Sequence, residues 1–390
     1  MNNVRIGYDG STAYSGNILI EGNSLQQLSQ QAGAGSIAVQ TTGTLTVQSA
    51  RTGFTQLRAG GGALGFDDDW NFGSSLAGFT LGKSTNTLGL TLSNALTAAG
   101  PIAITGGNVN LNASLTSTLA GAGIRVRSSG DIVANGNLSA AGDATLTFQA
   151  DHDIRIASSA NVAIAASGGK LNTVLWADAN GSGGGTVYFG NQSETTTTTI
   201  NTGGGHVWAG GGSGSAIWNG LNVGNGYANS DTGTASWDGV ELRKTSITTA
   251  GGDVLLKGRN DRVVNTDARV GLYVSNSNVS TGAGSLTLDG QTTYRTGSVP
   301  SINVGVLIEN SSSLASSDGA IAITGTQNGF NTEAEGVKLV NSSVSATGSG
   351  NLTITGTSDN DNGSVNATKS GIVLLASGAN AVAKVSTNSG

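Results

Sequence analysis

A repeat of 31–35 residues in the C-terminal part of the chain constrains the fold more than any other feature. The repeat begins at a glycine that precedes an apolar stretch, at Gly239, Gly271, Gly305, Gly336 and Gly371. In the first four units a second apolar residue follows 8 or 9 positions later, at Ile247, Val279, Leu314 and Val344. An alternating apolar pair comes next (Val254/Leu256, Leu286/Leu288, Ile321/Ile323 and Leu352/Ile354). A glycine that we expect to close the unit stands two residues further on, at Gly258, Gly290, Gly325 and Gly356.

The apolar residues alternate with a period of two, which predicts β-strands of roughly 3–5 residues. Strands this short are stable only when each one hydrogen-bonds to its equivalent in the next repeat, about 4.8 Å away. Stacking also piles the inward Val, Ile and Leu side chains into one continuous core. The sequence therefore predicts an all-β chain folded as a right-handed parallel β-helix, with three short strands per coil and inserted loops.

The composition excludes several other fold classes. The 390 residues include 63 glycines, 2 prolines and no cysteine. So much glycine disfavours helices, so little proline excludes collagen, and the lack of cysteine excludes a disulfide scaffold and a thiolate metal site. At 37% hydrophobic residues the chain is too apolar for a disordered polar tract.

The charge and the distribution of apolar residues exclude several kinds of binding partner. Eighteen basic against 24 acidic residues give a net charge of −6, and no basic stripe indicates nucleic-acid binding. No apolar run is long enough to predict insertion into a membrane. No apolar segment of a signal peptide follows the first residues, so we expect an internal segment of a longer polypeptide.

The regularity of the repeat pattern varies along the chain. We interpret residues 1–390 as a single β-helix segment with irregular coils over 1–100 and compact coils over 101–175. Residues 176–236 are expected to form Gly/Trp-rich coils with long loops, and 237–390 the regular repeats. Residues 23–28 favour a short helix. We expect about 12–16 coils and a rod of roughly 55–75 Å.

Two stretches resemble a known family. Residues 130–148 (GDIVANGNLSAAGDATLTF) and 246–258 (SITTAGGDVLLKG) are similar to repeats of the filamentous-haemagglutinin-like exoproteins. The resemblance covers roughly residues 100–390. It implies a large bacterial surface protein with a right-handed β-helical shaft, exported by two-partner secretion through an outer-membrane partner. The secretion domain of that family, with its Asn-Pro motifs, does not occur in this sequence.

The sequence lacks the residue patterns of the common hydrolase and metal sites. No Gly-x-Ser-x-Gly occurs, and the only two histidines, His152 and His206, stand 54 residues apart. The outward middle positions of the repeat strands are Glu241, Tyr273, Leu307, Lys338 and Val373, which hold a single acid. Glycoside hydrolysis needs two carboxylates, so we expect no enzyme activity. The alternative is a β-helical carbohydrate-active enzyme, either a polysaccharide lyase or a glycoside hydrolase.

Acidic turns offer weak candidate ligands for calcium. They are Asp67, Asp69, Asp359 and Asp361. Carboxylate oxygens suit Ca²⁺, but the spacing matches neither an EF-hand nor a calcium-binding nonapeptide. Solvated turns explain these residues without a cofactor, and structural calcium is the alternative.

Aromatic residues of the middle region are the candidate ligand-binding residues: Trp176, Trp208, Trp218, Tyr227 and Trp237. Exposed aromatic faces stack on sugar rings, whereas buried ones form a column inside the coils or under loops. Both arrangements remain open from the sequence.

These observations predict the structural shaft and adhesive surface of a secreted or surface-displayed bacterial adhesin, located outside the cell or on its surface. Its expected partners are a host or neighbouring cell surface, including glycans. The predicted register makes two substitutions diagnostic. Val337→Asp should cost several kcal/mol because it places a charge in the core, and Lys338→Ala should be near neutral because 338 faces outward.

Overall fold

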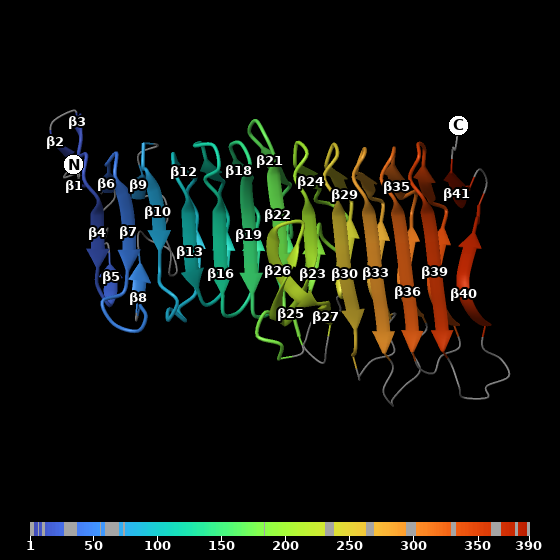
Figure 1. Cartoon of the computed structure of the whole chain (residues 1–390). Helices are drawn as coiled ribbons and strands as arrows, with labels where there is room; N and C mark the ends of the chain where they lie inside the picture. The colour runs from blue at the N-terminus through green and yellow to red at the C-terminus, as the bar shows by residue number, and fades with distance from the viewer. Residues whose placement is uncertain are drawn as a thin grey trace.

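The computed structural model describes residues 4–6, 8–9, 12–26, 37–54, 56–58, 70–72, 75–182, 184–230, 238–262, 269–293, 302–328, 333–359, 368–378 and 381–387. Its described residues form strands and no helix, and they stack into an elongated parallel β-helix with the termini at opposite ends (Figure 1). Three long parallel sheets form its walls. The fold prediction is confirmed, and the hand of the coil stays a prediction.

Sheet I is the longest wall. Its main path holds β4 (Ile18–Glu21), β7 (Thr44–Gln48), β10 (Gly78–Leu81), β13 (Ile102–Gly106), β16 (Ile124–Ser128), β19 (Ala144–Ala150), β22 (Leu171–Trp176), β25 (Val207–Trp218), β30 (Val254–Asn260), β33 (Leu286–Thr293), β36 (Ile321–Asn328) and β39 (Leu352–Asp359). Two further strands, β26 (Leu221–Gly226) and β27 (Ala228–Ser230), pair with it off this path. At strand spacing this path is about 53 Å long.

Sheets II and III have ten strands each. Sheet II consists of β11 (Leu90–Leu92), β14 (Val109–Leu111), β17 (Ile132–Ala134), β20 (Ile154–Ile156), β23 (Val187–Phe189), β28 (Val240–Arg243), β31 (Arg269–Ser275), β34 (Asn303–Glu309), β37 (Glu333–Val340) and β40 (Thr368–Leu375). Sheet III consists of β12 (Leu96–Ala98), β15 (Leu115–Ser117), β18 (Leu138–Ala140), β21 (Val162–Ala166), β24 (Thr198–Asn201), β29 (Thr245–Thr248), β32 (Asn278–Ser280), β35 (Ser313–Ser316), β38 (Ser343–Ala346) and β41 (Lys384–Thr387).

The first coils have shorter walls. β1 (Val4–Ile6), β6 (Ile37–Val39) and β9 (Trp70–Phe72) form one small parallel sheet, and β5 (Ser24–Gln26) pairs with β8 (Gln56–Arg58). β2 (Tyr8–Asp9) and β3 (Thr12–Ala13) pair antiparallel. The expected helix at 23–28 is wrong, because Ser24–Gln26 is a strand in register with the next coil.

The repeat register is confirmed. Val254 lies beside Leu286, which lies beside Ile321 and then Leu352. On sheet III, Ile247, Val279, Leu314 and Val344 form a second row. These side chains are buried in one apolar core that runs from the first coils to the last, except that Leu352 at the end is partly exposed.

The glycines expected to close each unit do not end the strands. β33 continues past Gly290 to Thr293, and β36 continues past Gly325 to Asn328. Here the backbones of sheets I and II touch: a Cβ on Gly290 would overlap the carbonyl oxygen of Gly305, and one on Gly325 would overlap that of Gly336. We call this contact line, formed by Gly258, Gly290, Gly325 and Gly356 against Gly271, Gly305, Gly336 and Gly371, the glycine pinch. These positions are glycine because no side chain fits between the two walls.

Serine hydroxyls accept hydrogen bonds from the backbone N–H groups at the corner between sheets II and III. The backbone N–H of Thr245 donates to Ser277 Oγ (2.9 Å), that of Ser277 to Ser312 Oγ (3.1 Å) and that of Ser312 to Ser342 Oγ (3.0 Å). Each hydroxyl donates in turn to a carbonyl of its own corner. The buried corners thereby keep their polar groups paired from coil to coil.

Candidate functional site

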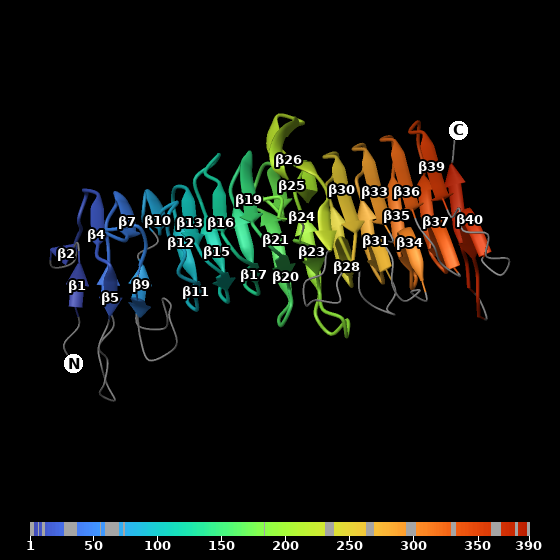
Figure 2. The same ribbon diagram turned by 90° about the horizontal axis from the view of Figure 1, so that it is seen from below.

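The middle of the rod departs from parallel stacking on sheet I. β25 runs past the sheet and turns at Asn219–Gly220 into β26, which pairs with it antiparallel. Both turn residues have positive φ, as a two-residue hairpin turn requires. The hairpin lies over the outer face of sheet I and projects from the rod (Figure 2).

Two of the candidate aromatic residues lie beneath this hairpin. Trp176 on β22 and Trp208 on β25 point outward from sheet I, but they are only 5% and 1% exposed. They pack with Val174 and Val223, and Trp176 Nε1 donates to the carbonyl of Gly212 (2.7 Å). Their rings form a small second core that attaches the hairpin to the wall.

Trp218 stands at the hairpin end and is half-buried. Its ring meets the His206 ring edge-on, with centroids 5.6 Å apart. Next to it, Asn219 Nδ2 donates to Asp253 Oδ2 (2.6 Å), and the Asp253 backbone N–H donates to His206 Nδ1 (2.9 Å). The tip of the hairpin is therefore fixed to the following coil by polar contacts that the sequence did not reveal.

Tyr227 follows the hairpin and reaches two coils further. Its hydroxyl donates to Asp289 Oδ2 (2.7 Å) and accepts from Gln291 Nε2 (2.6 Å), while Lys257 Nζ lies 4.5 Å from the ring centroid. Burial and the Asp289 carboxylate raise the pKa of this phenol. Trp237, the fifth candidate, lies outside the described residues.

The solvent face of the hairpin is a candidate contact surface. Ile217 is 74% exposed, and Ser213, Ser215 and Asn222 are exposed with it. An apolar side chain at the outermost part of a rigid rod is free to contact a partner, whereas Trp176 and Trp208 are not.

The outward face of sheet II is covered instead of exposed. Tyr188, Glu241, Tyr273 and Leu307 form one outward row, and all four are buried, Glu241 to 1% exposure. The outward direction predicted for Glu241, Tyr273 and Leu307 is confirmed, and the structure adds that these outward side chains are covered. Lys338, next in the row, has a side chain that is 15% exposed and pairs with the buried Glu335 (3.1 Å).

Charged groups on this face are paired with one another. Arg243 bonds Glu241, and its guanidinium lies 4.7 Å from the Tyr273 ring centroid. Glu194 accepts hydrogen bonds from Ser275 Oγ (2.6 Å) and Asn276 Nδ2 (3.1 Å). Burial raises the pKa values of Asp238 and Glu241, and the repulsion between the two carboxylates adds to the rise at Asp238.

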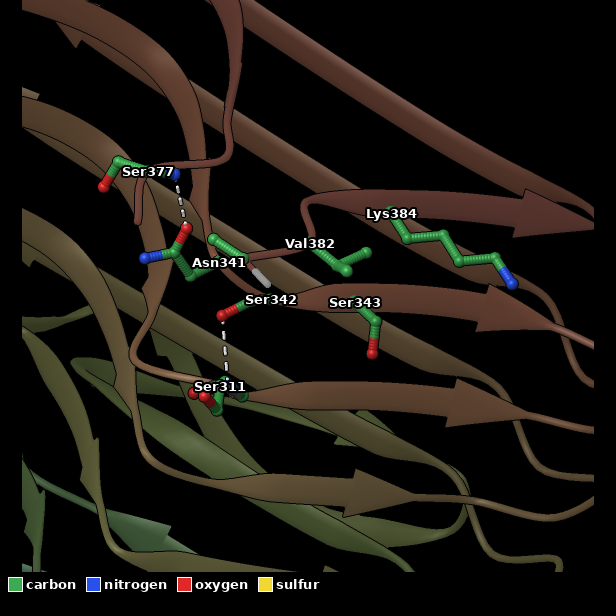
Figure 3. A pocket seen from close by; sticks show the side chains of 9 residues that line it. Ser311, Asn341, Ser342, Ser343, Ser377, Val382 and Lys384 are labelled. Atoms are coloured by element: carbon green, nitrogen blue, oxygen red, sulfur yellow. Dashed lines mark hydrogen bonds between the residues drawn. The ribbon is translucent and has the colours of Figure 1, made fainter. Parts of the chain in front are cut away.

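A groove of about 530 Å³ lies along the last three corners between sheets II and III (Figure 3). Ser311, Ser312, Asn341, Ser342, Ser377 and Lys384 line it. Asn341 Oδ1 already accepts from the Ser377 N–H (2.8 Å), and Ser342 Oγ belongs to the serine corner. Its polar groups therefore serve mainly to join the coils.

The structure leaves most of the calcium candidates untested. Asp67, Asp69 and Asp361 lie outside the described residues, and Asp359 ends β39. Across the described ranges, no three histidine or acidic side chains gather as metal ligands would. His152 is an exposed corner residue, and Asp153 beside it pairs with Arg155 (2.6 Å).

The described part of the chain also offers no helix with the length and hydropathy needed to cross a membrane. Comparison of the chain with protein-family models, with curated proteins and with solved structures found no match.

Proposed function

We propose that this chain is the structural shaft and adhesive surface of a secreted or surface-displayed bacterial adhesin. The observation that carries the proposal is the unbroken parallel ladder of sheet I, from β4 to β39, with a firmly attached hairpin projecting from its middle. A long hydrogen-bonded rod holds a contact element at a fixed distance from whatever anchors it.

Contact through the rod is expected to be multivalent. The exposed Ile217 face supplies one apolar contact, and neighbouring copies on one cell supply others. Weak contacts combine into strong attachment when they engage together. The partners we propose are a host or neighbouring cell surface, including its glycans, and an outer-membrane export partner for the full-length protein.

The burial and ion pairing of the acidic residue on sheet II favour a non-catalytic role. On the outward row of sheet II, Glu241 is buried and paired with Arg243, so it has no access to a polysaccharide. A carbohydrate-active enzyme needs two carboxylates that reach the substrate. It stays the alternative function.

Two assays test the proposal. In the first, the chain is incubated with a panel of polysaccharides, and we expect no release of reducing or unsaturated ends. Sustained turnover would establish the enzyme instead. In the second, labelled chains multimerised on beads are applied to bacterial and epithelial cells and to immobilised glycans.

A matched pair of variants locates the contact. Ile217→Asp places a charge on the exposed hairpin face, and Thr324→Asp places one on the exposed face of β36 away from the hairpin. We expect the first variant to reduce bead attachment about tenfold or more and the second to leave it unchanged. Equal attachment by both variants would remove the hairpin from the adhesive surface.

A further inference from the structure

The glycine pinch divides the interior of the C-terminal coils into two compartments. On one side lies the apolar core between the three sheets. On the other side, β30, β33 and β36 run on past their glycines, while β31 and β34 begin before theirs. The two walls therefore enclose a second strip of interior beside the main core.

Ala334, in register with Asn303, points into this second strip, but most of the side chains there are polar. The polar side chains are Asn260, Thr292 and Gln327 from sheet I and Arg269 and Asn303 from sheet II, and each is at most 2% exposed. Their direction follows from alternation on sheet I, where each stands two residues beyond an inward glycine. On sheet II, Val270 and Val304 pack in an outward cluster, which turns the preceding Arg269 and Asn303 inward. We call this strip the polar lobe.

Some polar groups in the lobe have protein partners. Ser358 Oγ contacts Gln327 Oε1 (3.1 Å) and donates to the carbonyl of Ala334 (2.9 Å). At the other end, Asn260 Nδ2 donates to Asp238 Oδ1 (3.3 Å). These bonds link the two walls across the lobe at the first and the last described coils of the repeat region.

The coil that contains Thr292 and Asn303 lies between these two and, among the described residues, lacks such bonds at both positions. In the described structure, neither Asn303 Nδ2, Asn303 Oδ1 nor Thr292 Oγ1 has a hydrogen-bond partner, although all three atoms are buried. Thr292 and Asn303 stand two residues from Gly290 and Gly305, which touch, so both lie on the same side of that contact. Buried polar atoms in folded proteins almost always bond to protein or to ordered water.

We infer that the polar lobe holds ordered internal water between Thr292 and Asn303. The chemistry of the unpaired atoms selects the ligand, because they include both a donor amide and an acceptor amide oxygen, next to a hydroxyl that can act either way. A cation satisfies only acceptors and an anion only donors, whereas water satisfies both. The rod then has a dry core and a parallel hydrated strip, separated by two backbones in contact.

The decisive experiment is a crystal structure of the 390-residue chain at a resolution that shows water. The expected result is density for at least one water within hydrogen-bond distance of both Thr292 Oγ1 and the Asn303 amide. An empty lobe, or density that refines as a metal ion, a halide or a larger molecule, would overturn the inference.

Solution measurements give a second, independent test. Magnetic relaxation dispersion of water oxygen reports internal waters that exchange slowly. The variant Thr292→Val/Asn303→Leu keeps the side-chain volumes and removes the polar groups, and we expect it to lose part of that signal. Thr324→Val, on the exposed face of β36, is the control and should keep the whole signal. If the double variant fails to fold, Thr292→Val alone is measured, and a signal equal to wild type in a folded variant contradicts bound water.

Discussion

Side chains of sheet II show that direction and exposure are separate properties of a residue. Alternation along β28 and β31 places Glu241 and Tyr273 outward, as the sequence predicts. Residues far away in the chain contact this sheet, such as Glu194, which accepts a hydrogen bond from Ser275, 81 positions later in the chain. A two-residue period contains no information about such contacts, so the sequence predicted the side but not the environment.

The buried carboxylates should make stability depend on pH. Burial raises the pKa values of Glu241 and Asp238 above the ordinary carboxylate values of roughly 4. Between the ordinary and the raised values, the folded state holds protons that the unfolded chain has released. The free energy of unfolding should therefore fall as the pH rises through this window.

This pH dependence is measured as the melting temperature from pH 4 to 7. Glu241→Gln cannot ionise and should give a shallower fall than wild type, whereas Glu21→Gln on an exposed strand should keep the wild-type profile. A wild-type melting temperature that rises steadily over this range would contradict the burial of these carboxylates.

Lys338→Ala should destabilise the protein, in contrast to the near-neutral effect expected from the sequence. The substitution removes the ammonium from Glu335, which is 4% exposed, so a buried carboxylate loses its cation. We expect a loss of about 1–3 kcal/mol, and Val337→Asp in the core should cost more. Thermal or urea unfolding of both variants checks the order, and a Lys338→Ala variant as stable as wild type would mean that Glu335 is solvated.

At the scale of elements, glycine has two roles that look alike in the sequence. A glycine after an apolar pair ordinarily indicates a turn. The sequence alone therefore predicts that Gly258 and Gly290 close their repeat units. In the structure they lie inside strands, where two walls meet. The spacing of the glycines was predictable, but the contact partner of each was not, because it lies on a different sheet.

Gly290→Ala tests the glycine pinch. Its Cβ would overlap the carbonyl oxygen of Gly305, and backbone cannot move aside cheaply, so we expect a loss of about 3 kcal/mol or more. Gly89→Ala is the matched control, because its Cβ would lie 3.4 Å from the nearest atom and fits. Unfolding midpoints of the two variants should differ clearly, and coinciding midpoints would show that the sheets do not touch there.

The hairpin is the element that sequence patterns missed. Residues 209–215 read AGGGSGS, which resembles a loop, yet they form the middle of β25. The strand is held by the tryptophans beneath it and by pairing with β26, not by its own propensity. Sequence reasoning singled out the aromatic residues of this region as candidate ligand-binding residues and left open whether they were buried.

Trp208→Ala should destabilise the hairpin and its wall by about 3–5 kcal/mol, because it empties the small core under β25 and β26. Ile217→Ala on the opposite face should change stability by less than about 0.5 kcal/mol. Near-ultraviolet circular dichroism and thermal unfolding follow both variants. Similar effects of the two substitutions would place the tryptophan ring in solvent.

For the whole molecule, the sequence predicted the strand rows of the regular repeats and the middle region closely. Val109, Ile132 and Ile154 stack as the short apolar stretches indicated. The first hundred residues were less predictable because their coils differ in length and share no repeated glycine. Regular stacking can be predicted from a sequence because each coil repeats the same pattern of apolar residues. An insertion occurs only once, so no repeated pattern predicts it.

The last coil predicts self-association of the 390-residue chain. Ile372, Leu374 and Val385 continue the inward rows of Val337, Leu339 and Val344, but they are 44%, 51% and 37% exposed. Strand edges beside exposed aliphatic groups bind other strand edges. We expect the sedimentation coefficient to rise with concentration, and Ile372→Lys/Leu374→Lys to abolish the rise without unfolding the rod. Thr324→Lys on the side of the rod should behave as wild type, and a wild-type chain that stays monomeric at every concentration would show that this end does not associate.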